Sequence, residues 1–243
     1  MARGSPDYQS IATSTVRLEQ GNVNASAFDT GFSRMDGGGR VVFYDDFRAG
    51  VYRYQLDVDG GANLPELDFS EGHMFGFSPS MKLDPLVNGG ITGFHMFADM
   101  PASGKIGYEF SVYLINNHGR VATNFAMAFQ NGANYYFGLK IDDTTHAISL
   151  QTVPGYDLVF TPILGSYFLN RNITLKLIVD PAHGTYDKLF VGAQMMDVSS
   201  HTAPQGFTNQ AGATYLDFYH EGRTAVIKEE IWLNYLIFSA DEP

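Results

Sequence analysis

Cysteine is absent from the 243 residues of this chain, which excludes a disulfide framework and any thiolate metal site. No apolar run approaches the ~18 residues that a membrane-spanning helix needs. The opening residues also lack the apolar stretch of a signal peptide. From these absences we expect a protein without membrane contact that either stays in the cytoplasm or leaves it within an assembly.

Basic residues are few as well. The chain has 15 Lys and Arg against 26 Asp and Glu, a formal net charge of −11, and the basic residues form no cluster. Because binding to phosphates needs a basic surface, this balance argues against nucleic acid as a partner. Tryptophan occurs once, at Trp232, whereas Phe (19), Tyr (14) and Gly (26) are abundant. This composition is typical of a soluble β-sandwich.

The first 39 residues differ from the rest. They are polar, weakly periodic and end in three glycines, Gly37 to Gly39. Such a segment buries too little apolar surface to fold alone, so it is either a solvated tail or an arm held by a partner. We interpret residues 1–39 as an extended N-terminal arm that contacts its own domain or a neighbouring subunit, and 40–243 as the folded domain.

Apolar and polar residues alternate with a period of two through most of residues 40–243, and no helical pattern interrupts them. This predicts strands over 105–114, 121–129 and 134–141, and a hairpin turning at Gly184. A last strand over 224–240 is expected to place Ile227, Ile231, Leu233, Tyr235 and Ile237 on one face. About a dozen strands exceed one open sheet, so we predict an all-β fold of two face-packed antiparallel sheets.

The strand order carries a resemblance to a known superfamily. The segments "KIGYEFSVYL", "YYFGLKID", "NITLKLIVDPAHGTYDKLFVGAQMMDV" and "EEIWLNYLIF" resemble the concanavalin A-like jelly roll of lectins and glucanases. The stretches "DGGGRVVFYDDFRAG", "SGKIGYEF" and "LKLIVDPAHGTYDKLFV" are similar to uncharacterised bacteriophage virion proteins. The resemblance implies a non-enzymatic accessory protein of a virion, decorating a capsid or attached to a tail. It would dock to other protein subunits, most simply as a homo-oligomer, and a cell-surface glycan is a further expected partner.

An acidic triplet with the spacing E-x-D-x-x-E provides the one candidate for catalysis. Laminarinase-type glucanases of this fold carry such a motif, and the resemblance implies Glu66 as nucleophile, Asp68 as its modulator and Glu71 as acid/base. Retaining hydrolysis needs two carboxyl groups ~5 Å apart, whereas Glu66 and Glu71 on a regular strand would lie ~16 Å apart. Glycines and a proline surround the triplet, which favours a solvated loop. We therefore expect no enzyme and keep the hydrolase as the alternative.

The remaining candidates concern ligand binding. Five tyrosines could stack on sugar rings, although alternating aromatic residues in strands also form cores; Tyr135, Tyr215 and Tyr219 are the ones we single out. Asp142 and Asp143 could bind calcium in a lectin-like manner, although aspartate also favours turns. No zinc-ligand spacing and no nucleophile motif occurs. We expect no cofactor, and calcium is the one candidate. The alternative function is a lectin-like glycan-binding module.

Overall fold

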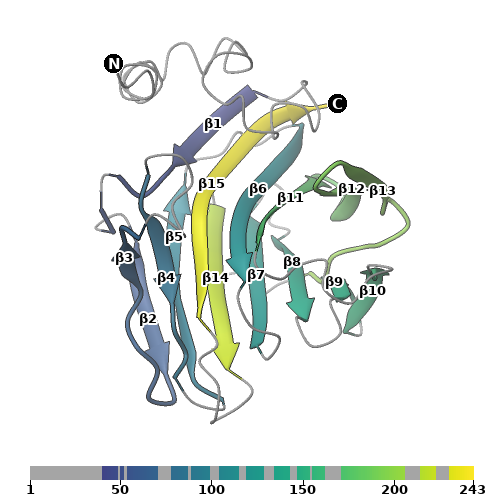
Figure 1. Ribbon diagram of the computed structural model, residues 1–243. Coiled ribbons are helices and arrows are strands. Elements are labelled where there is room, and N and C mark those ends of the chain that lie inside the picture. Colours follow the sequence, from purple (N-terminus) through teal and green to yellow (C-terminus); the bar gives the residue numbers. More distant parts are fainter. Residues whose placement is uncertain are drawn as a thin grey trace.

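The computed structural model describes residues 40–48, 50–51, 54–70, 78–86, 89–98, 104–114, 119–128, 134–142, 147–153, 155–161, 171–205, 214–222 and 230–243. In these residues all regular structure is β-strand, and two antiparallel sheets pack face to face (Figure 1). No helix in the described part of the chain is long and apolar enough to cross a membrane. The predicted two-sheet antiparallel sandwich is confirmed, while the predicted arm, residues 1–39, lies outside the described residues.

Eight strands form sheet A, with β15 at its centre. Its order is β13 (Gln194–Asp197), β12 (Thr185–Val191), β11 (Arg171–Asp180), β6 (Lys105–Leu114), β15 (Ile231–Glu242), β4 (Ser80–Leu83) and β3 (Glu66–Asp68), with β1 (Arg40–Asp45) also paired to β15. Strand β6 covers the predicted segment 105–114. The β11–β12 hairpin turns through Gly184 at a φ of 67°, a backbone conformation that glycine adopts without strain.

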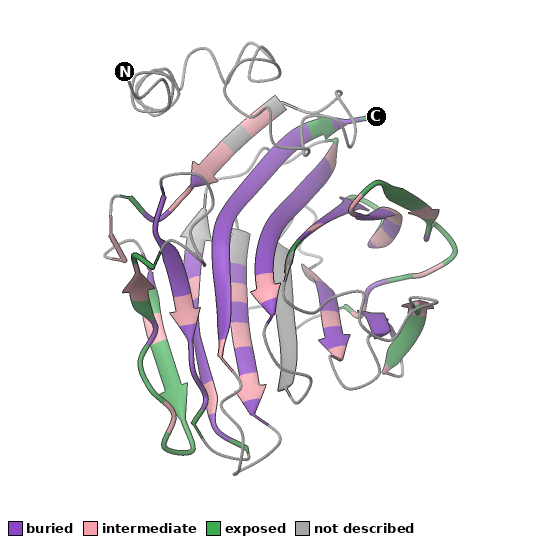
Figure 2. Ribbon diagram, viewed as in Figure 1, coloured by how far each residue is buried: buried purple, intermediate pink, exposed green. Residues whose placement is uncertain are grey.

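Seven strands form sheet B. Its order is β10 (Tyr156–Phe160), β9 (Ala147–Gln151), β8 (Asn134–Asp142), β7 (Gly119–Ala128), β14 (Thr214–Gly222), β5 (Ile91–Ala98) and β2 (Gln55–Asp59). Among the described residues, the strand pairs of both sheets are antiparallel, as hairpins and Greek-key connections allow. Burial is greatest along the central strands, and β2, β10 and β13 at the sheet edges are largely exposed (Figure 2).

Aromatic rings fill the space between the sheets. Phe110 of sheet A meets Phe218 of sheet B edge-on, with ring centroids 5.4 Å apart. Phe218 also stacks on Phe94 of β5 at 5.7 Å. On the other side, Phe137 of β8 contacts Tyr186 of β12 edge-on at 5.4 Å. Edge-on and offset contacts of this kind add to the free energy of burial, so the ring pairs fix how the two sheets pack.

Strand β15 contains a bulge at Asn234 that reverses its facing pattern. Leu233 pairs with Val112, but Tyr235 pairs with the adjacent Ser111, so one residue of β15 is left over. Leu233 therefore faces the core, whereas Tyr235 faces outward. The sequence-based prediction of one face from Ile231 to Ile237 was wrong because an inserted residue shifts the period-two alternation.

The bulge residue is held by side chains from both neighbouring regions of sheet A. Asn234 is fully buried, and its Oδ1 accepts a 2.7 Å hydrogen bond from Ser80 Oγ. Its Nδ2 donates to Asn172 Oδ1 at 2.7 Å. One edge of β15 pairs with β4 before the bulge and with β1 after it, while the other edge pairs with β6. This long strand therefore has three neighbours in sheet A.

Candidate functional site

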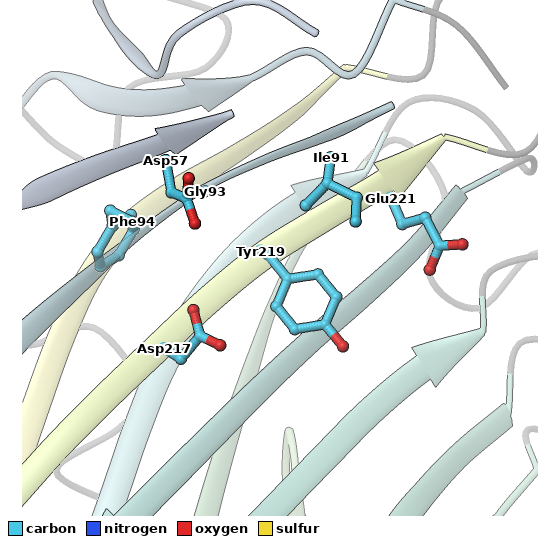
Figure 3. A pocket seen from close by; sticks show the side chains of 7 residues that line it. All are labelled: Asp57, Ile91, Gly93, Phe94, Asp217, Tyr219 and Glu221. Atoms are coloured by element: carbon cyan, nitrogen blue, oxygen red, sulfur yellow. The ribbon is translucent and has the colours of Figure 1, made fainter. Parts of the chain in front are cut away.

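A groove opens on the outer face of sheet B, the face turned away from the core. It has a volume of about 330 Å³ and is lined by strands β2, β5 and β14 (Figure 3). Asp217, Tyr219 and Glu221 come from alternate positions of β14, so all three project on the same side. Asp57 of β2 and Ile91 of β5 line the same groove across from them. The groove therefore combines three carboxylates with one phenol ring.

Gly93 makes the groove possible because a larger residue there would collide with β14. In the sheet register Gly93 lies between Asp57 and Tyr219. A Cβ atom on Gly93 would lie 2.7 Å from Tyr219 Cβ and would also press on the carbonyl oxygen of Phe218. Since backbone atoms cannot yield as a flexible side chain can, the close approach of β5 and β14 requires glycine.

The chemistry of the groove suits a ligand with many hydroxyl groups. Carboxylates accept hydrogen bonds from hydroxyls, and a tyrosine offers an apolar face together with a polar tip. In the backbone register of the sheet, Asp217 lies opposite His95 of β5 and Glu221 lies opposite position 120 of β7. No group of three or more Asp, Glu or His side chains within the described ranges is arranged to hold a metal ion.

A buried polar pair lies on the opposite side of the same strands, facing the core. His220 and Thr92 pair directly across β14 and β5, and both have no exposed surface. Neither ring nitrogen of His220 makes a hydrogen bond with the described residues. Thr92 Oγ1 likewise has no hydrogen-bond partner among them. Burial lowers the pKa of His220 to about 4, and a polar contact with the backbone of Leu83 only partly opposes this. His220 is therefore neutral at pH 7.

The acidic triplet begins in the other sheet, sheet A, and its two described residues have structural partners. Glu66 and Asp68 are the first and last residues of the edge strand β3 rather than part of a loop, while Glu71 lies outside the described residues. Glu66 is exposed and pairs with Lys82 Nζ at 3.2 Å. Asp68 Oδ2 accepts a 2.5 Å hydrogen bond from Trp232 Nε1. The only tryptophan is thus close to the triplet, as a donor to Asp68.

The tyrosine candidates fall in different places. Tyr219 lines the groove. Tyr215 lies two residues before Asp217 on β14, and its side chain is outside the described part. Tyr135 packs on the edge of the core, where its ring occupies the space above Gly184. Of the calcium candidates, Asp142 ends β8 and Asp143 lies outside the described residues.

Comparison with solved structures identifies the architecture. A protein of unknown function with a galectin-like fold from Bacillus subtilis matches with a TM-score of 0.54 at 11% identity, over 84% of this chain and 97% of that chain. The fold is a two-sheet antiparallel jelly roll, similar to the galectin-like fold of that protein. A carbohydrate esterase from the Shiga toxin-encoding bacteriophage phi24B matches with a TM-score of 0.52 at 10% identity, over 84% of this chain and all of that chain.

A third similar structure, a protein of unknown function from Shewanella oneidensis, has a TM-score of 0.51 at 13% identity and covers 92% of both chains. Identities this low establish the jelly roll alone. Comparisons with protein-family models and with curated proteins find no match.

The sequence reasoning missed most of the groove. It selected Tyr219 but not Asp217 and Glu221, although the alternating D-x-Y-x-E of β14 was visible in the sequence. Asp57 lies within β2, and Asp59 ends that strand, where its Oδ1 accepts a 2.7 Å hydrogen bond from the Gly60 amide. No local signal links β2 to β14, because β5 brings them together in the sheet.

Proposed function

We propose that this chain is a carbohydrate-binding jelly-roll module without catalytic activity that serves as an accessory part of a larger assembly. The observation that carries the proposal is the groove on sheet B, where Asp57, Asp217 and Glu221 surround Tyr219 over a glycine floor. Concave sites with a few polar groups placed around an apolar surface are typical of small-ligand binding. The acidic lining favours a neutral saccharide over a sialylated, sulfated or phosphorylated one.

A binding experiment with groove variants tests this proposal. The full chain is screened on a broad glycan array, and the affinity for each neutral hit is measured by calorimetry. Asp217→Asn replaces a charged acceptor oxygen with an NH2 group, and Tyr219→Ala removes a stacking surface. Each loss should cost ~1–1.5 kcal/mol of binding free energy and so weaken binding about tenfold. Asp197→Asn, at an exposed position of β13 in sheet A, is the matched control. No signal across the array, or equal affinity in all variants, would contradict the groove assignment.

The assembly is proposed to be a bacteriophage virion, with the protein decorating a capsid or attached to a tail. The likeness to a phage-encoded carbohydrate esterase supports this setting, together with the sequence resemblance to phage virion proteins. The arm, residues 1–39, would supply the contact with neighbouring subunits by adding an extended segment to them. Deleting 1–39 should leave the thermal unfolding of the domain unchanged and abolish assembly measured by light scattering. Normal assembly of the shortened chain would contradict the proposal.

The glucanase alternative is tested by reducing-sugar release from β-glucans. Glu66 is exposed and paired with Lys82, and Asp68 accepts from Trp232; these contacts support structural roles for both acids. We expect no release by the wild type or by Glu66→Gln. Turnover that Glu66→Gln abolishes would establish the alternative.

A further inference from the structure

The groove occupies one end of a longer track on the outer face of sheet B. One register row crosses all seven strands through Asp57, Gly93, Tyr219, Ala122, Lys140, Ser149 and Leu158. We call this set the cross-strand row. Neighbouring strands lie ~4.8 Å apart, so the row is ~29 Å long and Leu158 lies ~19 Å from Tyr219.

The far end of the row carries an exposed apolar platform on the edge strand β10. Leu158 is 61% exposed and Tyr156, two residues before it on the same side, is 38% exposed. The Nζ of Lys140 lies 4.5 Å from the ring centroid of Tyr156. A cation over one ring face holds the ring in place by electrostatic attraction. The platform is thus an oriented aromatic surface rather than a mobile side chain.

The two ends of the row have complementary chemistry. The groove provides carboxylates that accept hydrogen bonds from hydroxyl groups, and the platform provides a ring and an aliphatic surface on which the apolar faces of sugar rings can lie. Between them, Lys140 supplies an ammonium donor, whereas Ser149 is buried. Both ends lie on the same outer face, so one extended ligand can contact both.

We propose that Tyr156 and Leu158 form a second saccharide subsite, so that the ligand is a linear neutral chain bridging Tyr219 and Tyr156 rather than a terminal sugar. This inference rests on the proposed glycan-binding function and adds a length requirement to it. A short saccharide reaches only the groove, and a chain that spans ~19 Å gains the platform. Linking two contacts in one ligand raises affinity because the second contact forms without a new loss of translational freedom.

Calorimetry with oligosaccharide ladders tests the inference on the full chain. The probes are laminari-, cello- and chito-oligosaccharides from disaccharide to octasaccharide. The affinity for the bound ladder should rise with length and reach a plateau once the chain spans the row. Tyr156→Ala should remove about a five- to tenfold gain at the long end and leave the shortest ligands unaffected, and Tyr156→Phe should retain the gain. Asp157→Asn, whose register partner is Leu150 of the core, is the matched control on β10.

Each other outcome decides against the inference in a distinguishable way. Affinity that is independent of length, with Tyr156→Ala equal to wild type, overturns the second subsite and leaves the groove proposal in place. No binding of any ladder overturns both the groove and the subsite. Concentration-dependent dimerisation of the full chain that Leu158→Ser disperses would assign the platform to a second copy of this chain, and would overturn the saccharide subsite.

Discussion

Acid should destabilise this protein through one buried histidine, and replacing His220 by leucine tests the reasoning. His220 is completely buried between the sheets opposite Thr92, and burial lowers its pKa from an ordinary 6.5 to about 4. Above pH 6.5 the imidazole is neutral in both the folded and the unfolded chain, so it adds no pH dependence there. As the pH falls below 6.5, the unfolded chain gains a proton that the folded protein resists until about pH 4. The free energy of unfolding must therefore decrease over this interval.

The size of the effect follows from the pKa. One pH unit between the two pKa values corresponds to ~1.4 kcal/mol, so His220 should lower the free energy of unfolding by ~3 kcal/mol in total once the pH is below 4. At pH 5 the loss should be ~2 kcal/mol. This is a large part of the 5–15 kcal/mol or so that typical domains have. Leucine cannot be protonated, and it also removes two buried ring nitrogens without hydrogen-bond partners among the described residues.

Urea unfolding at pH 7.5 and pH 5.0 measures the difference between His220→Leu and the wild type. At pH 7.5 the variant should be as stable as the wild type or somewhat more stable, because burying an unsatisfied polar group is unfavourable. At pH 5.0 its advantage should be larger by ~2 kcal/mol. Ser111→Ala, which removes another buried polar group without a partner among the described residues but no titratable group, is the control and should differ from wild type by the same amount at both pH values. A difference between His220→Leu and wild type that stays constant from pH 7.5 to 5.0 would refute the argument.

Three other predictions concern sites where the packing leaves little freedom. Gly93→Ala should lower the free energy of unfolding by ~1–3 kcal/mol in urea titrations and weaken saccharide binding, since its Cβ would push β5 from β14; unchanged stability would show that the strands can separate. Trp232→Phe removes the donor to Asp68 and should cost ~1.5–3 kcal/mol, whereas Asp68→Asn, which keeps an acceptor, should cost less; equal losses would contradict a directional bond. Lys176→Met breaks a buried 2.8 Å ion pair with Glu242 and should cost ~3–5 kcal/mol in urea titrations at neutral pH, because it leaves a buried carboxylate without its cation; a loss below ~1 kcal/mol would contradict this.

The sequence predicted the positions of the strands better than which side chains of a strand face the core. Alternation placed β6 at 105–114 and the hairpin at Gly184, because both depend on a local period and a local turn. The prediction of which β15 side chains share a face was wrong after Asn234. The bulge there is stabilised by Ser80 and Asn172, which are distant in sequence. A contact that depends on residues more than fifty positions away leaves no mark in the local pattern.

The groove shows the same limit for function. Its β14 residues were available as an alternating motif, yet Asp57 comes from a strand 160 positions earlier. Glycine at position 93 carries no side-chain chemistry, and only the close contact with Tyr219 explains its role. Conversely, the E-x-D-x-x-E spacing was the most recognisable motif in the sequence, but Asp68 has a structural partner in Trp232. Spacing along the chain thus singled out Glu66, Asp68 and Glu71, whereas sheet register brings together Asp57, Asp217 and Glu221.

The two outer faces of the sandwich are not equivalent, and this decides where a ligand can bind. On the outer face of sheet A, Trp232, Tyr235 and Ile237 are each at most 3% exposed. Tyr235 Oη donates to Glu109 at 3.0 Å there, and burial, with the Glu109 charge second, raises the pKa of Tyr235 well above its usual range. Side chains this deeply covered cannot also contact a dissolved saccharide. Sheet B, in contrast, keeps Asp57 and Leu158 exposed at opposite ends of the cross-strand row, so the extended ligand that we propose would bind to that sheet.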